Sequence, residues 1–371
     1  MDILFSSPRF PPDKYIGTLT LLASRLNDRG HSVTGIQERR DRIDEFPIEM
    51  FDTPSMGAPW WVRLWWYYRS WRQTVSTYLK RHTPDVIVTN QRTHVPTLQG
   101  AVDHGVPVVA LIEGLGFMRY NAQNLARDKR PSFLNLPLAK KPQYPFIWSL
   151  YRQQCDAFPK FAEVIGLSDF LCAVINATFD TPSTMIRASI DVDHVRANSR
   201  DPEYITMVNP RNELKGGDIF VKVAERMPDR RFFVAGHFAS DSRTNKVDRL
   251  DNVWHPGWID DMQEVYAKTK ILLIPSLVEE GNPRVKAEAL ANGIPVIGTD
   301  RGGVPEMLDG AGAVVSDPYD IDQWQRQIAA VKDDYESLSD GARNNVTEYD
   351  IDENMPKFLQ MIERAAESEQ Q

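Results

Sequence analysis

The strongest constraint on the fold of this chain is a repeated alternation of short apolar runs with helix-length amphipathic stretches. The apolar runs are, in chain order, DILFSS, SVTGIQ, DVIVTN, VPVVALIE, LCAVIN, YITMVN, RFFVAG, VWHPG, ILLIPS, IPVIGTD and GAVVS. Short runs rich in β-branched residues predict strands. Strands that alternate with helices predict parallel sheets with helices on both faces. The sequence therefore predicts an α/β fold with doubly wound parallel sheets.

A polar break at RANSRDPE, residues 196–203, divides the alternation into two runs. A chain of 371 residues suits two domains of roughly 150–200 residues each. We expect one domain over residues 1–195 and a second over residues 196–350. Residues 351–371 are predicted to form a helix with an acidic tail that packs back toward the first domain. Ligands of doubly wound sheets bind outside the carboxyl ends of the strands, so we expect the two domains to face each other across a cleft.

The charge distribution bears on the partners. The net charge is −8, but residues 1–190 carry 22 Lys and Arg against 17 Asp and Glu, and residues 191–371 carry 21 against 34. An acidic chain is atypical of proteins that wrap nucleic acid, and we predict no nucleic-acid partner. The two cysteines, Cys155 and Cys172, have neither disulfide-framework nor metal-site spacing. The start of the chain lacks the pattern of a signal peptide, and we expect a cytoplasmic protein.

Two glutamates frame the most informative loop. ILLIPS predicts a buried strand, and the loop after it contains Glu280. Asn282 is a good N-cap and Pro283 a good first helical residue, so a helix is predicted to begin there and to stop at Gly293. Glu280 then lies at the carboxyl edge of the sheet and Glu288 on the helix. Carboxylates accept hydrogen bonds from sugar or ribose hydroxyls, and a helix start suits a phosphate.

Charge spacing alone leaves a second interpretation open. Arg284 and Glu288 are four residues apart and fit a solvated pair on one helix face. Glu280 is then an ordinary loop charge.

Two further strand-end loops have the residues of a ligand site. VNPRNELKGGD contains Arg211, Lys215 and Gly216, and TDRGGVPE contains Gly302 and Gly303. Cations neutralise a diphosphate, and glycines let the backbone approach a ligand closely. A plain glycine turn explains either loop by itself, but three such loops at strand ends favour a binding site.

These residues carry a family resemblance. PSLVEEGNPRVKAEALANGIPVIGTDRGGVPEML resembles the signature of retaining glycosyltransferases of family 4, whose hallmark is Glu-x7-Glu. The resemblance is specific over residues 204–310 and thinner in the first half, where YIGTLTLLASRLNDRGHSV is similar to the family's first glycine loop. It implies a GT-B fold of two Rossmann-like domains. The first would bind the acceptor, and the second the nucleotide-sugar donor.

The same resemblance implies roles for individual residues. Glu280 would contact the hydroxyls of the donor sugar, Glu288 the ribose, and Lys215 the diphosphate. It implies no metal and no cofactor, since cations and helix N–H groups stabilise the leaving diphosphate. The implied catalytic residues are Glu280, Lys215 and Arg211, and the implied donor-binding residues are Gly17, Ile259, Asn282, Arg284, Val285 and Glu288.

The chain departs from the family pattern at three places. Asn282 and Pro283 stand where the family usually has Phe-Gly, and Pro283 has no backbone N–H to donate. Pro210 stands where an arginine usually follows the strand. The family's first-domain histidine has no counterpart near ALIEGLGF, so Glu113 and Gly114 are the candidate residues of a first-domain site.

Residues 59–80, PWWVRLWWYYRSWRQTVSTYLK, contain five of the nine tryptophans. On a helix the aromatic side chains, with the exception of Trp66, form one stripe, with cations on the opposite side. Such a helix suits the headgroup region of a bilayer with anionic lipid, and a second aromatic-basic stretch, AKKPQYPFIWSLYR, follows in the same half. The alternative is that the stripe packs on its own domain or lines the acceptor cleft. The candidate membrane or acceptor face is Trp61, Trp65, Tyr68 and Arg72.

The leading hypothesis is a retaining glycosyltransferase that moves a sugar from a nucleoside diphosphate to a hydroxyl of a glycan, a lipid-linked acceptor or a small molecule. Its partners would be the nucleotide sugar, that acceptor and a membrane surface contacted peripherally. Catalysis would rest on leaving-group stabilisation and positioning. The alternatives are a nucleotide-sugar epimerase and a catalytically silent GT-B subunit that binds a sugar nucleotide.

Overall fold

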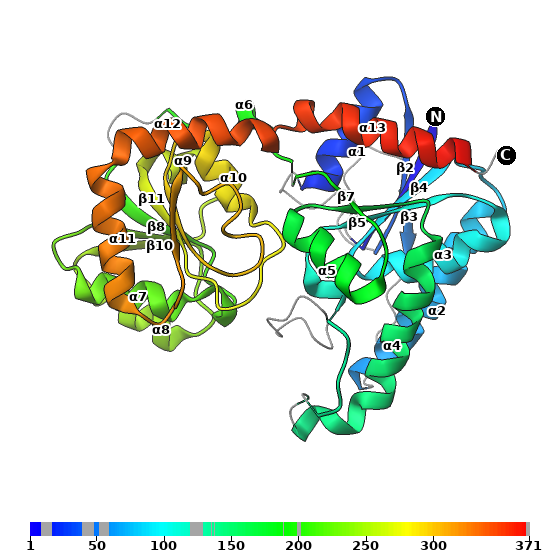
Figure 1. Ribbon diagram of the computed structural model, residues 1–371, viewed down its shortest axis with the longest axis horizontal. Helices are drawn as coiled ribbons and strands as arrows, with labels where there is room; N and C mark the ends of the chain where they lie inside the picture. Colours follow the sequence, from blue (N-terminus) through cyan, green and yellow to red (C-terminus); the bar gives the residue numbers. More distant parts are fainter. Residues whose placement is uncertain are drawn as a thin grey trace. The chain divides into compact units, whose positions relative to one another are not determined.

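The chain forms two compact units in a computed structural model. Unit 1 comprises Met1–Ser189 with Asn354–Gln371, and unit 2 comprises Ile190–Glu353 (Figure 1). Part of the polar break predicted at residues 196–203 lies outside the described residues. The structure describes residues 1–8, 17–38, 48–51, 59–118, 129–134, 136, 138–187, 189–198 and 202–368.

Unit 1 contains a seven-stranded sheet with the strand order β3-β2-β1-β4-β5-β6-β7. Each described neighbouring pair is parallel. The order reverses between β1 and β4, which makes the sheet doubly wound, as predicted. The strands are β1 (Asp2–Ser6), β2 (Ser32–Glu38), β3 (Ile48–Phe51), β4 (Val86–Asn90), β5 (Val108–Ile112), β6 (Glu163–Gly166) and β7 (Thr184–Met185).

Six α-helices belong wholly or largely to the described part of unit 1. The last helix lies against unit 1, where Arg364 Nε donates to Glu163 Oε1 at 2.6 Å and Lys357 Nζ donates to the Met185 carbonyl. The helices are α1 (Thr18–Asp28), α2 (Trp60–Leu79), α3 (His94–Ala101), α4 (Tyr144–Ala157), α5 (Asp169–Phe179) and α13 (Ile351–Ser368).

One predicted strand of the first half is wrong. LCAVIN lies inside helix α5, which Ser168 caps by accepting a hydrogen bond from the Leu171 backbone N–H at 3.1 Å. Leu171, Val174 and Ile175 are buried on one face, the i, i+3, i+4 spacing of a helix. A six-residue apolar run is too short to distinguish a buried strand from one face of a helix. Strands β3, β6 and β7 were not predicted.

The aromatic side chains of helix α2 are partly buried and partly exposed to solvent. Tyr67, Tyr68 and Trp71 are buried in unit 1, and Trp71 Nε1 donates to Ser6 Oγ at 3.0 Å. This part of the stripe is core, as the alternative interpretation predicted. The first turns of the helix differ, because Trp65 and Trp66 are exposed to solvent.

Unit 2 contains a six-stranded sheet with the order β10-β9-β8-β11-β12-β13. Its described strand pairs are parallel, and each strand predicted for the second half is present. The strands are β8 (Tyr204–Val208), β9 (Phe232–Ala235), β10 (Val253–Gly257), β11 (Thr269–Ile274), β12 (Val296–Thr299) and β13 (Gly312–Val315).

Helices cover both faces of the sheet in unit 2. Ile271 and Leu273 of β11 pack into a core shared with α7 and α11, whereas Leu272 and Ile274 pack into a second core with α9, α10 and α12. This alternation is the period of two expected for a strand buried on both faces. The helices are α6 (Val192–Val195), α7 (Gly217–Arg226), α8 (Asp241–Val247), α9 (Met262–Lys268), α10 (Arg284–Ala291), α11 (Ile321–Asp333) and α12 (Tyr335–Asn345).

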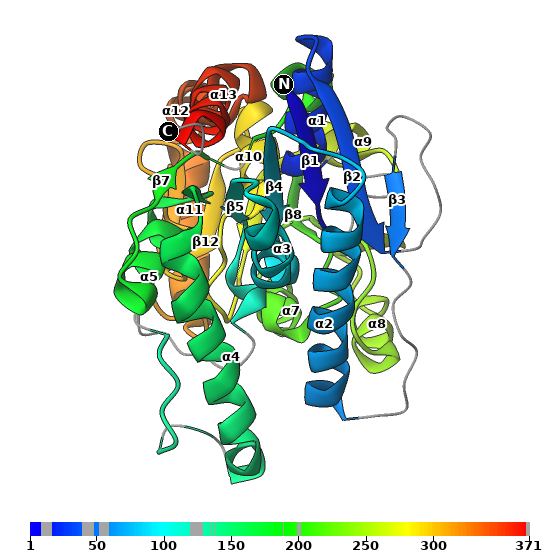
Figure 2. The same ribbon diagram turned by 90° about the vertical axis from the view of Figure 1, so that its right-hand side faces the viewer.

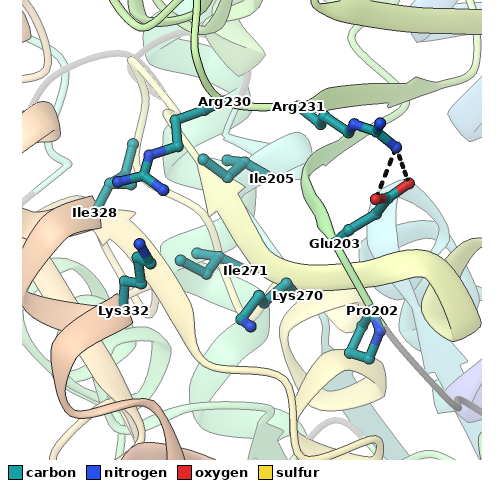
Figure 3. Close-up of a pocket in the computed structure, with 9 residues that line it drawn as sticks. All are labelled: Pro202, Glu203, Ile205, Arg230, Arg231, Lys270, Ile271, Ile328 and Lys332. Carbon is teal, nitrogen blue, oxygen red and sulfur yellow. Dashed lines mark hydrogen bonds and ion pairs between the residues drawn. The ribbon is translucent and has the colours of Figure 1, made fainter.

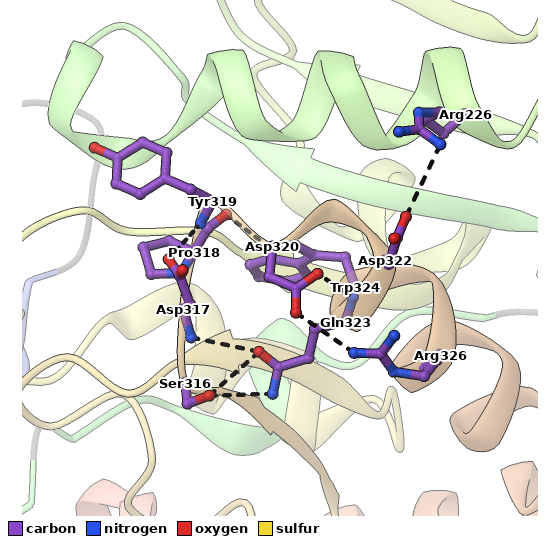
Figure 4. Close-up of polar contacts among 10 residues, drawn as sticks. All are labelled: Arg226, Ser316, Asp317, Pro318, Tyr319, Asp320, Asp322, Gln323, Trp324 and Arg326. Carbon is purple, nitrogen blue, oxygen red and sulfur yellow. Dashed lines mark hydrogen bonds and ion pairs between the residues drawn. The ribbon is translucent and has the colours of Figure 1, made fainter.

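Trp324 anchors α11 and the turn that precedes it (Figure 4). Its side chain is fully buried, and Nε1 donates to the Pro318 carbonyl at 3.0 Å. Asp320 caps the helix by accepting from the Gln323 backbone N–H at 2.9 Å. The Gln323 side chain in turn contacts Ser316. The indole therefore packs in the core of unit 2 and, through its hydrogen bond, fixes the turn between β13 and α11.

We predict that Trp324→Ala lowers the free energy of unfolding of unit 2 by about 3–5 kcal/mol, because a fully buried indole is replaced by a cavity. Chemical denaturation followed by circular dichroism measures the change. The control is Trp258→Ala, whose side chain is 46% exposed and which should change stability by less than about 1 kcal/mol. Equal effects of the two substitutions would contradict this account of the core.

Candidate active site

Three loops of unit 2 meet at the carboxyl edge of its sheet. They follow β8, β11 and β12 and comprise residues 209–216, 275–283 and 300–304. These strands are neighbours in the sheet and run parallel, so their carboxyl ends lie side by side. The structure thus brings together the three glycine- and charge-containing loops that the sequence analysis selected.

An ion pair joins the first two loops. Lys215 Nζ lies 2.8 Å from both carboxylate oxygens of Glu280, and Ser276 Oγ donates to Glu280 Oε1 at 2.5 Å. The Glu280 side chain is only 14% exposed. The Leu277 backbone N–H donates to the Leu214 carbonyl at 2.8 Å, which aligns the two loops. A cation and a carboxylate are therefore held at one place on the sheet edge.

Two glycines allow the loops to approach this closely. Gly216 has φ +80, and a Cβ there would lie 1.8 Å from the Pro275 carbonyl oxygen. Gly302 has φ +61, and its Cβ would lie 2.3 Å from the Glu280 carbonyl oxygen. Both positions therefore require glycine for conformation and for space. The Gly303 backbone N–H donates to the Glu280 carbonyl at 2.8 Å, which attaches the third loop.

Glu288 is fixed by two partners. Tyr266 Oη donates to Glu288 Oε2 at 2.6 Å, and Arg284 Nη2 lies 3.3 Å from Oε1. Burial, and then the negative charge of Glu288, raise the pKa of Tyr266 well above its ordinary value of 10, so the phenol remains a donor at neutral pH. The Arg284–Glu288 pair proposed by the second interpretation exists. However, Glu288 is buried rather than solvated.

The predicted start of α10 is displaced by one residue. The helix begins at Arg284 with Pro283 as its N-cap, and Asn282 lies before the cap, largely buried. The prediction of Asn282 as N-cap is wrong because Pro283 has ψ 117, an extended conformation outside the helix. The predicted end holds: the helix stops before Gly293, which has φ +64.

Lys286 was not among the predicted site residues. Its side chain is fully buried, and Nζ donates to the carbonyls of Gly303 at 2.6 Å and Glu306 at 2.8 Å. The ammonium also lies 5.7 Å from the centre of the Tyr349 ring. Lys286 therefore ties α10 to the third loop. The sequence offers only one signal for this, a lysine four residues before the buried Leu290 on the apolar side of the helix.

Three other predicted donor-side residues, Arg211, Ile259 and Val285, lie in unit 2. Arg211 is exposed in the first loop, and within the described ranges its guanidinium has no hydrogen-bond or ion-pair partner. Ile259 follows β10 and packs against Phe233 and Val265. Val285 is the second residue of α10 and is half-buried against the core.

The first-domain candidates lie in unit 1. Gly17 is the N-cap of α1, with extended backbone angles. Glu113 follows β5 and accepts a hydrogen bond from Asn90 Nδ2 at 2.6 Å, at the carboxyl end of the neighbouring strand β4. Gly114 has an extended backbone with φ 175. Glu113 is therefore held at the carboxyl edge of the sheet of unit 1.

The candidates for a membrane or acceptor face also belong to unit 1. Trp61 is half-buried and stacks on Phe146 with ring centres 4.1 Å apart. Trp65 and Arg72 are exposed, whereas Tyr68 is buried. Tyr68 is therefore a core residue and does not lie on such a face.

The described parts of the chain show neither a metal-binding cluster nor a membrane-spanning helix. They contain no group of three or more His, Cys, Asp or Glu side chains arranged to hold a metal ion. No helix in these parts combines the length and apolar character needed to cross a bilayer. Both cysteines are free thiols.

Comparison with known proteins bears first on the fold. Two solved structures are similar over nearly the whole chain. Sucrose-phosphate synthase from Thermosynechococcus elongatus has a TM-score of 0.76 at 13% identity, over 98% of this chain and 99% of that one. HepE of Anabaena, in complex with UDP, has a TM-score of 0.73 at 16% identity, over 98% of this chain and 100% of that one. The fold is GT-B.

The family match lies in unit 2. Residues 203–334 match the model of the family described as glycosyl transferases group 1. The D-inositol 3-phosphate glycosyltransferase of Mycolicibacterium smegmatis is 26% identical over 172 residues, or 40% of this chain. The chain spans 39% of the length of that relative. The matched family segment contains the three loops, the Lys215–Glu280 pair and Glu288.

We predict that Gly216→Ala lowers the free energy of unfolding of unit 2 by at least about 3 kcal/mol, since the methyl group meets a backbone carbonyl that cannot move freely. The matched control is Gly310→Ala. Gly310 also has a positive φ, +66, but nothing lies within 4 Å of its Cβ position, so its cost should be about 1–2 kcal/mol. Urea denaturation compares them, and similar losses would refute the close approach of the two loops.

Proposed function

We propose that this protein is a retaining glycosyltransferase of the family 4 type, which transfers a sugar from a nucleoside diphosphate sugar to an acceptor hydroxyl. The observation that carries the proposal is the Lys215–Glu280 pair, held by three strand-end loops. This pair lies inside the segment that matches the glycosyl transferases group 1 family. It combines a cation for a diphosphate with a carboxylate for sugar hydroxyls at the edge where doubly wound sheets bind ligands.

The chemistry of these side chains supports a donor site in unit 2. On donor binding, Lys215 exchanges one carboxylate contact for a phosphate oxygen, and Glu280 then accepts hydrogen bonds from the sugar. Arg211 supplies a second cation for the diphosphate. Glu288 accepts from the ribose in a position set by Tyr266 and Arg284. That HepE was solved with UDP and with UDP-glucose supports a nucleotide sugar as the ligand class.

The remaining donor contacts come from backbone and helix start. The backbone of Ile259 edges the base. A role of Gly17 in phosphate binding stays a prediction of the family resemblance. Asn282 and Val285 flank the start of α10, whose free N–H groups favour an anion. Pro283 has no N–H, which removes one donor from this start.

Catalysis in this proposal is electrostatic stabilisation of the departing diphosphate, together with positioning of the acceptor hydroxyl. Lys215 and Arg211 take the part that a divalent cation plays in other transferases, and we propose a reaction that needs no metal and no cofactor. Glu113 and Gly114 contribute to the first-domain side of the reaction. Two competing hypotheses differ from this proposal in what they predict. An epimerase needs no acceptor, and a silent sugar-nucleotide-binding subunit shows no turnover.

We expect Glu280→Gln to lower kcat for transfer or donor hydrolysis at least about 100-fold, because the reacting sugar loses an oriented charged acceptor. The measurement is product formation from a panel of UDP- and GDP-sugars, with and without acceptor and with EDTA. The control is Glu264→Gln, an exposed glutamate on α9, which should retain full activity. Turnover by Glu280→Gln equal to that of the unmodified chain would refute the assigned role, and loss of turnover with EDTA would refute metal independence.

We also propose that the acceptor side of the enzyme works at a membrane surface, on an acceptor such as a lipid-linked glycan. Large apolar side chains are exposed on unit 1 in the first turns of α2 and in the segment leading into α4, with Leu134 and Leu138 each 83% exposed. The two regions are in contact: Trp60 Nε1 donates to Gln143 Oε1 at 2.8 Å, and Trp61 stacks on Phe146. This aromatic surface comprises Trp61, Trp65, Trp66, Phe133, Leu134, Leu138, Phe146 and Trp148.

The arrangement of these helices suits insertion into an interface. In both views α2 and α4 extend beyond the sheet of unit 1 on the same side (Figures 1 and 2). The contacts of Trp60 and Trp61 place the start of α2 beside the start of α4. The aromatic surface therefore lies at the projecting ends of these two helices.

The charge around the aromatic surface supports an anionic bilayer as the proposed partner. Residues 59–80 and 129–155 contain nine Lys and Arg and no Asp or Glu. Arg63, Arg69 and Lys140 are exposed there, and Lys141 lies over the Phe133 ring at 5.2 Å. Aromatic side chains with exposed cations among them fit the headgroup region of anionic lipid. We therefore propose a cytoplasmic protein that associates peripherally with the inner face of a membrane.

We expect Trp65→Ser/Trp66→Ser to reduce co-sedimentation with vesicles of phosphatidylglycerol and phosphatidylcholine at least about fivefold, because two interfacial anchors are lost. Trp258→Ser, an exposed tryptophan of unit 2, should bind like the unmodified chain. Binding to purely zwitterionic vesicles should be weak. Equal vesicle binding by all three proteins, or a concentration-dependent dimer that the double substitution abolishes, would contradict the membrane proposal.

A further inference from the structure

A pocket of unit 2 lies at the amino edge of its sheet, opposite the edge that carries the candidate active site (Figure 3). Its volume is about 230 Å³. Glu203 precedes β8, Arg230 and Arg231 precede β9, Lys270 is the second residue of β11, and Lys332 projects from α11. The pocket therefore adjoins the amino ends of β8 and β11, the strands whose carboxyl ends carry the first two loops of the candidate active site.

The charges of this pocket are not balanced. Glu203 is engaged by Arg231, whose Nη1 lies 2.7 Å from both carboxylate oxygens. Across the described residues, no hydrogen bond or ion pair engages the side chains of Arg230, Lys270 or Lys332. Lys270 lies over the Tyr335 ring at 4.8 Å, a contact that neutralises no charge. Figure 3 shows the head groups of Arg230 and Lys332 directed toward each other.

This cluster is unusual in its surroundings. Unit 2 carries 19 Lys and Arg against 31 Asp and Glu over Ile190–Glu353. In so acidic a unit, cations are expected to pair with carboxylates, as Arg231 does. Three like charges around one small pocket repel each other. A bound anion would remove that repulsion.

We propose that this pocket binds a small phosphomonoester. Arg230 offers a planar, two-pronged contact to phosphate oxygens, and Lys270 and Lys332 add two point charges. Apolar side chains of Ile205, Ile271 and Ile328 line the same pocket and would contact the organic part. The volume lies below the usual range for drug-sized ligands, so the ligand is small. This site is separate from the nucleotide-sugar site and does not depend on the proposed function.

The test is equilibrium binding of inorganic phosphate and of glycerol 3-phosphate to the full chain by isothermal titration calorimetry, with glycerol as the neutral probe. We expect saturable binding of both anions, tighter for the phosphomonoester, and no binding of glycerol. Arg230→Gln/Lys332→Gln should weaken anion binding at least tenfold. The charge-matched control Lys222→Gln/Arg249→Gln replaces two exposed cations elsewhere on unit 2 and should leave binding unchanged.

A third variant distinguishes the two sites. Lys215→Ala removes the diphosphate contact of the candidate active site, and we expect it to keep the saturable anion binding that Arg230→Gln/Lys332→Gln loses. The proposal is overturned if Lys215→Ala abolishes binding, if Arg230→Gln/Lys332→Gln binds as tightly as the control, or if no saturable binding occurs. None of these results depends on whether the protein transfers a sugar.

Discussion

The close approach of the loops after β8 and β11 is the contact on which the rest of the candidate active site depends. Lys215 and Glu280 can pair only because Gly216 lets its loop lie against the Pro275 carbonyl. A partly buried carboxylate costs free energy unless it is well hydrogen-bonded, and Glu280 meets this condition through Lys215 and Ser276. The loop after β12 then docks on the backbone of Glu280 through Gly302 and Gly303. One pair of neighbouring strands thus organises three loops.

Strands β8 and β11 have different electrostatic environments at their two ends. At their carboxyl ends a cation and a carboxylate neutralise each other in a hydrogen-bonded pair. At their amino ends the cations outnumber the carboxylates around a small pocket. Because a parallel sheet directs all carboxyl ends to one edge, the loops that follow the strands and the turns that precede them are separated by the length of the strands. This difference in charge between the two ends of the strands is the basis of the two ligand sites that we propose for unit 2.

Helix α2 of unit 1 contributes both to the core and to the exposed surface. The later turns of α2 bury Trp71 and Val75 in the core, and its first turns expose Trp65 and Trp66 beside the aromatic residues of α4. Periodicity predicted the stripe and placed Trp66 outside it, but it could not distinguish the exposed Trp65 from the buried Trp71, since both lie on the stripe. The difference arises because the helix is longer than the sheet face that it covers (Figure 2). Tyr68 consequently became a core residue.

By itself, the sequence determined the alternation of strands and helices, the two sheets of the GT-B fold, and the loops where charged residues and glycines follow strands. These features are local and periodic. The strand predicted at LCAVIN was wrong because its run is too short to show a period. The predicted start of α10 was wrong by one residue because ψ at Pro283 is not encoded by residue preference alone. Tertiary structure decided the pairing of Lys215 with Glu280, 65 residues apart, the hydrogen bond from Tyr266 to Glu288, and the burial of Lys286. Such contacts depend on which strands become neighbours, and sequence periodicity carries no information about strand order.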